Sequence, residues 1–292
     1  MSTRVKLVLL AFLLVAVGAG AYVNRGEGGE PETATAPSTG EDFADPCTRA
    51  ELELVEPDVL TVGVAGPSVL PWLAVDGGEP EGFEPDLVRA VAEFMFFAPG
   101  ELRWADVSRD EVLAAGPQGV DFVVGQLAPS ADLDATMDFT ESYYEVEQAV
   151  LARPGTPVAD GGATLAELRE ARLGAPAGAS HDTILTAIGP AGEAAVYETP
   201  AEAVAGLREG DVDAVLVDYP TALELLRGQG RGVVAAGRLP AQGDLVWALA
   251  TPEGSTLRAC LAAAIANVRQ QSFDLEIAQA WIEPDAPPLI LE

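Results

Sequence analysis

The chain has little positive charge and almost no lysine. Its 292 residues include 16 Lys and Arg against 46 Asp and Glu, which gives a formal net charge of −30 at pH 7, and its single lysine is Lys6. A surface of this sign is repelled by phosphate backbones and by anionic lipid headgroups. We therefore expect no nucleic-acid partner and no docking on an anionic membrane surface.

Histidine and cysteine are also scarce, which limits the available chemistry. His181 is the only histidine and has no Cys or His near it in the sequence, so it is a poor metal ligand and we expect no metal and no cofactor. The sequence shows no Ser-His-Asp set and no glycine-rich phosphate loop. These absences predict a protein that is not an enzyme.

The N-terminus combines basic residues with an apolar run. Arg4 and Lys6 precede the 17 apolar and small residues Leu7–Val23, and Ala19–Ala21 fits an A-x-A cleavage pattern. Residues 1–23 are therefore expected to be a signal peptide or, because a run of this length is at the lower limit for a membrane span, an uncleaved N-terminal anchor. Both alternatives place the rest of the chain outside the cytoplasm.

Residues 24–46 are rich in Gly, Pro, Thr and Glu. A segment of this composition buries too little apolar surface to fold, so we expect a disordered acidic linker. The two cysteines, Cys47 and Cys260, lie just after it and in a late helical segment. In an oxidising compartment a single pair favours a disulfide, and two buried free thiols are the alternative.

From residue 58 onward, short apolar runs alternate with stretches of helical periodicity. Strands are expected at 60–65, 101–107, 120–126, 172–178, 194–199, 213–218, 233–239 and 244–250. Helices are expected at 85–96, 164–172, 181–188, 200–210, 219–228, 255–271 and 273–282. Strands that alternate with helices predict sheets with helices on their faces, and the number of units predicts two α/β lobes.

Three stretches, in order, resemble the extracellular solute-binding proteins of family 3, the substrate-binding components of polar amino-acid transporters. They are Gly82–Met95, "GFEPDLVRAVAEFM", Met137–Glu145, "MDFTESYYE", and Gly210–Ala222, "GDVDAVLVDYPTA". Pro85 and Ser142 depart from the residues usual in that family. Two weaker matches lie in "PWLAVDGGEPEGFE" and "LGAPAGASHDTIL", and the resemblance covers most of the chain beyond the linker.

The resemblance implies the two-lobed type II periplasmic-binding-protein fold, an α/β architecture with two mixed sheets flanked by helices. Lobe 1 would comprise residues 58–150 and 246–285, and lobe 2 residues 151–245, with hinge crossovers near Ala149–Ala152 and Leu245–Leu249. A monomer of this kind holds a small molecule in the cleft between its lobes, and its partner is the permease of an ABC transporter.

The resemblance also places ligand contacts. Asp218 matches an aspartate that accepts a ligand ammonium group, with a helix N-cap as the alternative role. Trp72 matches an aromatic residue that packs against the ligand, with a lobe-edge core residue as the alternative. Gly178 and Ser180, next to His181, stand at a helix N-terminus suited to a carboxylate, and a plain helix cap is the alternative.

The acidic segment Gln126–Tyr144 is interpreted as loop-like, and it carries three further predicted contacts: Gln126, at the end of the preceding strand, Ala128 and Leu133. Leu133 stands where relatives have the arginine that clamps an α-carboxylate, and Asp132 and Asp134 beside it would repel one. A charge-assisted hydrogen bond contributes roughly 1.5–3 kcal/mol, so an ordinary amino acid should bind about 10- to 100-fold more weakly. Only an arginine from elsewhere would restore the contact.

Three functions remain as hypotheses. The chain captures a small polar solute, either amino-acid-like or a cation-bearing amine, for an ABC-type transporter. Alternatively, it is a degenerate binding-protein fold that serves as a membrane-tethered sensor or scaffold. The least favoured hypothesis is a dehydratase-like enzyme on the same fold, with an acidic side chain as general acid.

Overall fold

The computed structural model describes residues 47–66, 68–75, 77–160, 163–177, 179–229, 231–239 and 245–282. For residues 179–182 and 229 it describes the backbone alone. The expected signal peptide or anchor and the expected acidic linker lie outside these residues. Within the described ranges, no helix has the length and apolar character needed to cross a membrane.

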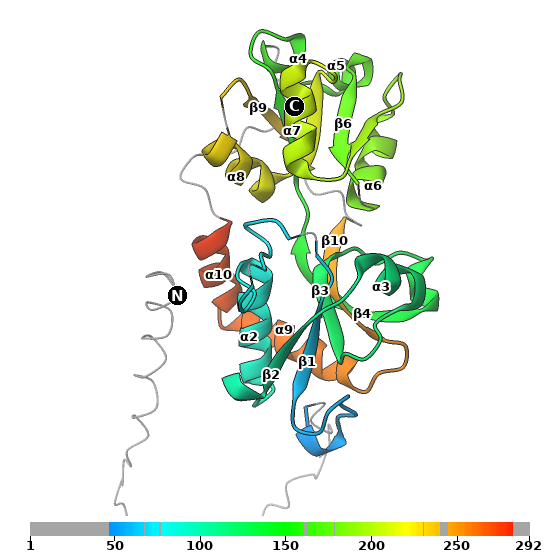
Figure 1. The fold of residues 1–292 in the computed structure, drawn as a ribbon, viewed down its shortest axis with the longest axis vertical. Coiled ribbons are helices and arrows are strands. Elements are labelled where there is room, and N and C mark those ends of the chain that lie inside the picture. The colour runs from blue at the N-terminus through cyan, green and yellow to red at the C-terminus, as the bar shows by residue number, and fades with distance from the viewer. Residues whose placement is uncertain are drawn as a thin grey trace, which may run out of the picture. The chain divides into compact units, whose positions relative to one another are not determined.

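The first sheet has five strands in the order β2-β1-β3-β10-β4 (Figure 1). β1 (Leu60–Val64) runs parallel to β2 (Leu102–Asp106) on one side and to β3 (Phe122–Leu127) on the other. β10 (Val246–Pro252) is antiparallel to both β3 and β4 (Met137–Glu145). The sheet is therefore mixed, and its last two strands come from distant parts of the sequence.

Helices cover both faces of this sheet. α2 (Phe83–Phe94), α9 (Leu257–Gln270) and α10 (Phe273–Trp281) lie together on one face, and α3 (Arg109–Ala115) lies on the other (Figure 1). Alternate strand residues separate into the two cores, because side chains alternate across a strand. Short 3₁₀ helices η1 (Arg49–Glu51), η2 (Pro99–Glu101) and η3 (Leu133–Ala135) lie in the connections.

A disulfide joins Cys47 to Cys260, with the Cα atoms 4.7 Å apart. It ties the start of the described chain to α9, and it confirms the pairing expected from the two cysteines. Both residues belong to the core on the α2 and α9 side of the sheet.

The second sheet also has five strands, in the order β7-β6-β8-β5-β9. β6 (Leu173–Pro176) is parallel to β7 (Ala195–Tyr197) and β8 (Ala214–Asp218). β5 (Gln148–Ala152) is antiparallel to β8 and to β9 (Val234–Leu239). The two mixed sheets flanked by helices confirm the predicted α/β fold class.

The five strands of the second sheet are covered by helices on both faces. These helices are α4 (Pro157–Asp160), α5 (Leu165–Glu170), α6 (Ala179–Ile188), α7 (Pro200–Glu209) and α8 (Tyr219–Gln229). Val150 and Leu216 pack in the core with α4, α5 and α6, whereas Ala149 and Val217 pack in the core with α7 and α8. Along β5 and β8, the buried even-numbered apolar residues therefore pack against α4, α5 and α6, and the odd-numbered ones pack against α7 and α8.

The chain passes between the sheets twice, after β4 and after β9. The first passage lies between Glu145 and Gln148, so the crossover predicted near Ala149–Ala152 is displaced by a few residues, because Ala149–Ala152 is paired in β5. The second passage lies between Leu239 and Val246, so the crossover predicted near Leu245–Leu249 falls mostly on β10. The second half of the acidic segment also differs from expectation, because Met137–Glu145 is a nine-residue strand rather than a loop. The lobe boundaries at residues 150 and 245 stay predictions.

Candidate functional site

Trp72 is held against the start of α2 by main-chain hydrogen bonds. The Glu84 N–H donates to the Trp72 carbonyl at 3.0 Å, and the Phe83 N–H donates to the Pro71 carbonyl at 2.9 Å. Gly82 makes this approach possible, because it has φ +130° and a Cβ at this position would lie 2.4 Å from the Trp72 oxygen. The glycine of the motif thus positions the tryptophan.

The indole of Trp72 reaches the end of β8 in the second sheet. Its Nε1 donates to Asp218 Oδ1 at 2.7 Å and to Thr221 Oγ1 at 3.1 Å. The Thr221 N–H also donates to Asp218 Oδ1, at 3.0 Å. Asp218 therefore serves as the cap of α8, the alternative role considered for it, and in addition accepts a hydrogen bond from a residue beside the other sheet.

Trp72 does not offer an open ring face. It is 0% exposed, and its ring lies edge-on to three aromatic rings, with centroid distances of 5.5 Å to Phe83, 4.6 Å to Tyr144 and 4.5 Å to Trp247. The polar N–H is thus the part of Trp72 directed at Asp218. In this arrangement the indole has no open face to which a cation could be attracted.

Asp218 is a buried carboxylate without an ion pair among the described Lys and Arg side chains. Burial raises its pKa, and the hydrogen bonds from Thr221 and Trp72 act in the opposite direction. These neutral donors satisfy Oδ1 but do not neutralise the charge of the carboxylate. A cation brought next to this group would supply the missing compensation.

Glu84 carries a second buried carboxyl group and lies in the first turn of α2, the helix that packs on the first sheet. Its Oε1 accepts the Gln126 N–H at 2.7 Å and the hydroxyl of Tyr143. Burial raises the pKa of Glu84 to about 7, against the lowering effect of these hydrogen bonds and of the charge of Arg109. Its Oε2 is buried and has no hydrogen-bond partner among the residues that the structure describes.

Gln126 lies near the end of β3, the strand end expected for it, and it meets Glu84 through its backbone. It has φ +54°, its N–H binds Glu84, and its carbonyl accepts Arg109 Nη2 at 3.2 Å. Its side-chain Nε2 is buried and has no hydrogen-bond partner within the described ranges. The left-handed backbone therefore turns the main chain toward charged groups and leaves the amide nitrogen unused.

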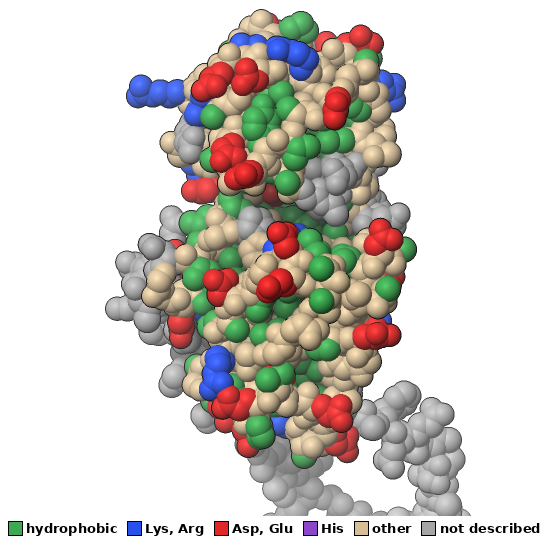
Figure 2. Space-filling view, turned by 45° about the vertical axis from the view of Figure 1, so that its right-hand side comes forward, with side chains coloured by type: hydrophobic (Ala, Val, Ile, Leu, Met, Phe, Trp, Pro, Cys, Tyr) green, Lys and Arg blue, Asp and Glu red, His purple; other side chains and the backbone are tan. Residues whose placement is uncertain are grey.

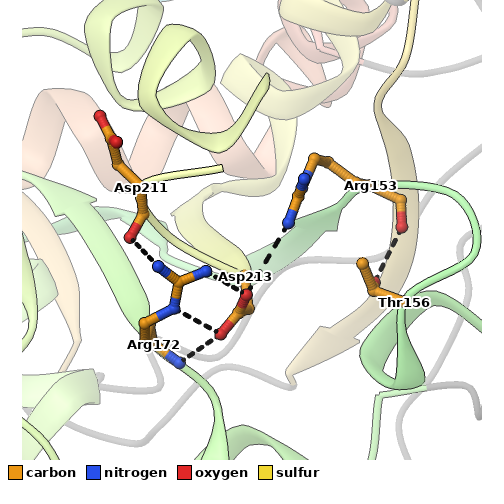
Figure 3. A network of polar contacts seen from close by, with 5 residues as sticks. All are labelled: Arg153, Thr156, Arg172, Asp211 and Asp213. Carbon is orange, nitrogen blue, oxygen red and sulfur yellow. Dashed lines mark hydrogen bonds and ion pairs between the residues drawn. The ribbon is translucent and has the colours of Figure 1, made fainter. Parts of the chain in front are cut away.

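The arginines that could replace the missing clamp are otherwise engaged. Arg109 Nη1 donates to the carbonyls of Ala65, Gly66 and Gly125. Arg153 Nη2 lies 3.9 Å from Asp213 Oδ1. Asp213 directly precedes β8, whereas Asp218 is the last residue of that strand, at its opposite end. Figure 3 shows Arg153 in the polar network around Asp213, with its guanidinium directed toward the Asp213 carboxylate.

The other residues predicted to contact the ligand lie in separate parts of the fold. Leu133 lies in η3, half-buried against the core on the α3 side, and Ala128 packs against the core on the α2 side. Gly178 lies outside the described residues, and Ser180 and His181 lie in α6 with side chains that are not described. The structure therefore brings Trp72 and Asp218 together, and sets Gln126 beside Glu84.

Two residues of this region were missed by sequence reasoning as site residues. Glu84 carried a signal, because it lies three and four residues before Leu87 and Val88 and therefore shares the buried face of α2. Thr221 carried none, because its contact with Trp72 depends on how two distant segments meet. Acidic side chains elsewhere are spread over the surface, as the face in Figure 2 shows.

Comparison with known proteins places the chain in a family. Residues 60–284 match the family model of bacterial extracellular solute-binding proteins, family 3. The chain belongs to this family. Its extracellular character agrees with the export expected from the N-terminus, and no curated protein matches the chain.

Solved structures share the fold of this family 3 protein. An ancestral arginine-binding protein bound to glutamine is 21% identical, with a TM-score of 0.63, and the match covers 77% of this chain and 98% of that one. The arginine-, lysine-, histidine-binding protein ArtJ from Geobacillus stearothermophilus is 21% identical, with a TM-score of 0.59 over 78% and 97% of the chains. At these identities the likeness establishes the type II periplasmic-binding-protein fold alone.

One further relative in fold bears on the enzymatic alternative. The ancestral amino acid-binding protein AncCDT-1, described as a precursor of cyclohexadienyl dehydratase, is 17% identical with a TM-score of 0.62, over 77% of this chain and 96% of that one. The family that matches this chain is described as one of extracellular solute-binding proteins.

Proposed function

We propose that this protein captures a small solute bearing an amine or guanidinium cation and delivers it to an ABC-type transporter. The observation that carries this proposal is Asp218, a buried carboxylate with no ion pair to any described Lys or Arg. A buried charge is costly unless it is paired, so a cationic ligand gains more at this position than a neutral one.

The residues around the predicted clamp position support a ligand without an essential α-carboxylate. Leu133 offers no charge, and Asp132 and Asp134 beside it are exposed carboxylates. Arg109 and Arg153 are held by main-chain carbonyls and by Asp213 respectively. A carboxylate would therefore lack the bidentate partner that a guanidinium supplies.

In this proposal the two predicted lobes close over the solute. Asp218 belongs to the second sheet and is hydrogen-bonded to Trp72 on the side of the first, so a solute held at Asp218 lies where the two sheets approach each other. The free energy of binding a solute between the two lobes stabilises their closed conformation. The expected N-terminal signal or anchor keeps the protein outside the cytoplasm, where the transporter collects its solutes.

A degenerate, ligand-free scaffold is the second candidate, and one observation favours it. The N–H of Trp72 already donates to Asp218, and the aromatic rings of Phe83, Tyr144 and Trp247 enclose the indole. A site whose carboxylate is satisfied by the protein itself has less need of a ligand.

Thermal-shift measurements with agmatine, putrescine, L-arginine, L-glutamine and L-glutamate separate the two candidates. A ligand present at 100 times its Kd stabilises the folded state by about 2.7 kcal/mol, which raises Tm by about 5–10 °C for a domain of this size. The cations should give this shift and L-glutamate should not. If no compound in the panel shifts Tm, the scaffold is favoured.

Asp218→Asn tests the residue, because it keeps a hydrogen-bonding side chain of the same size and removes the charge. The variant should lose the response to agmatine. Asp134→Asn is the matched control, since it removes one exposed charge from the acidic segment, and its response should equal that of the natural chain. Equal responses in both variants would show that Asp218 does not bind the cation.

A further inference from the structure

Gln148 is a buried amide whose polar atoms are both unused. It is the first residue of β5 and is 1% exposed. Within the part of the chain that the structure describes, neither its Nε2 nor its Oε1 has a hydrogen-bond partner. Burying an amide without partners destabilises a folded protein, so such a group requires a physical reason for its presence.

The register of the second sheet places Gln148 beside Asp218. The two residues are directly opposite each other in the antiparallel pair of β5 and β8. Side chains of directly opposite residues lie on the same face of a sheet, with Cβ atoms roughly 4.5–5.5 Å apart. An unpartnered amide and an unpaired carboxylate are therefore neighbours at the end of the sheet that Trp72 reaches.

The face that carries this pair is also identified by its neighbours. Val150 and Leu216 have the same parity as Gln148 and Asp218, and they pack in the core that includes Ile184 of α6. The pair therefore continues the face of the sheet covered by α6, whose first residue is Ala179.

We propose that Gln148 binds the ligand beside Asp218 and that the two together select a cation with N–H groups, a guanidinium or primary ammonium, over a quaternary ammonium. This inference rests on the function proposed above and names the chemistry of the cation. The Gln148 carbonyl oxygen accepts one ligand N–H while the carboxylate of Asp218 accepts another. The amide nitrogen remains available to donate to a hydroxyl or carbonyl oxygen of the ligand.

A quaternary ammonium ion fits this pair poorly for two reasons. It has no N–H to donate, so Gln148 Oε1 would stay buried and unpartnered in the complex, which a site of this kind disfavours strongly. It is best held by open aromatic faces, and the indole of Trp72 is fully buried among Phe83, Tyr144 and Trp247.

Isothermal titration calorimetry with agmatine and choline tests the selection. Agmatine carries a guanidinium and a primary ammonium group, and choline carries a quaternary ammonium. The natural chain should bind agmatine at least about 10-fold more tightly than choline, since one good hydrogen bond to a charged group accounts for that ratio. Equal affinities, or a preference for choline, overturn the inference and leave the cation proposal standing.

Gln148→Met tests the residue, because methionine has a similar shape and lacks the amide. The variant should bind agmatine at least about 10-fold more weakly, while its Tm without ligand stays equal or rises, because a buried unsatisfied amide has been removed. If Gln148 has only a structural role, Gln148→Met should lower the Tm and leave the affinity for agmatine unchanged. That result overturns the inference.

Gln271→Met is the matched control, since Gln271 is an exposed glutamine at the end of α9. Its affinity for agmatine should equal that of the natural chain. If neither cation binds the natural chain at all, the function proposed above fails together with this inference. If agmatine binds and Gln148→Met leaves its affinity unchanged, this inference alone fails.

Discussion

The indole Nε1 of Trp72 donates to Asp218 Oδ1 at 2.7 Å, and this bond joins a residue beside the first sheet to the last residue of a strand in the second. The same oxygen accepts the Thr221 N–H at 3.0 Å. One carboxylate therefore caps α8 and holds a residue beside the first sheet. A cation at Asp218 must share the carboxylate with these two donors or displace the indole.

Trp72→Phe should lower the free energy of unfolding, because it removes one donor from a buried charged acceptor while keeping an aromatic ring. The loss is expected to be about 1–3 kcal/mol, or a fall in Tm of about 2–10 °C. Urea denaturation and calorimetry measure both quantities. Trp281→Phe is the matched control, since Trp281 Nε1 donates to the half-buried Asp86 at 2.7 Å within the helices of the first sheet. A smaller loss for Trp72→Phe than for the control would contradict the prediction.

The raised pKa of Glu84 predicts that the free energy of unfolding depends on pH. Burial raises the pKa of this carboxyl group from 4.5 to about 7 in the folded protein, so the folded state holds its proton at a pH where the unfolded chain has released it. Its contribution to the free energy of unfolding is therefore fully present below pH 4.5. It is lost as the pH rises through about 7, and amounts to about 3 kcal/mol.

Glu84→Gln isolates this contribution, because glutamine resembles the protonated acid and does not titrate. Relative to the natural chain, the variant should become progressively more stable as the pH is raised from 4.5 to 7.5, as measured by urea denaturation at each pH. Glu141→Gln, which changes an exposed glutamate of β4, should run parallel to the natural chain. Parallel curves for Glu84→Gln as well would show that Glu84 does not gain a proton in the folded state.

The elements of this fold were largely predictable because they carry strong local patterns. Leu60–Val64 and Ala214–Asp218 are short apolar runs, and Leu87 and Val91 mark one face of a helix. Ala149–Ala152 of β5 was misread as a crossover, because a four-residue apolar run identifies a buried strand but does not say which sheet it joins.

The site was less predictable, because its contacts link residues far apart in the sequence. The end of an apolar strand indicated Asp218, but its bond to Trp72 spans 146 residues and depends on the meeting of two sheets. Gln148 carried no sequence signal of its own. Its importance depends on a cross-strand register with Asp218 that the linear pattern does not contain.

Reduction of the disulfide between Cys47 and Cys260 should destabilise the protein, because the bond closes a long stretch of chain, with a sequence separation of 213 residues. The expected loss is about 2–5 kcal/mol. Calorimetry with and without a phosphine reductant measures it. The double variant Cys47→Ser, Cys260→Ser should match the reduced protein and should not respond to the reductant. An unchanged Tm after complete reduction would contradict the prediction.

Leu133→Arg should shift the ligand preference toward α-carboxylates, because it restores a guanidinium where family resemblance places the clamp. L-arginine and agmatine differ by that carboxylate, so the ratio of their affinities isolates its contribution. The ratio should rise by about 10- to 100-fold in favour of L-arginine, as measured by calorimetric titration. Leu113→Arg, in α3, is the control, because Leu113 is exposed and the change adds the same charge elsewhere. A similar rise in both variants would show that the general reduction in negative charge, rather than the position of Leu133, sets the preference.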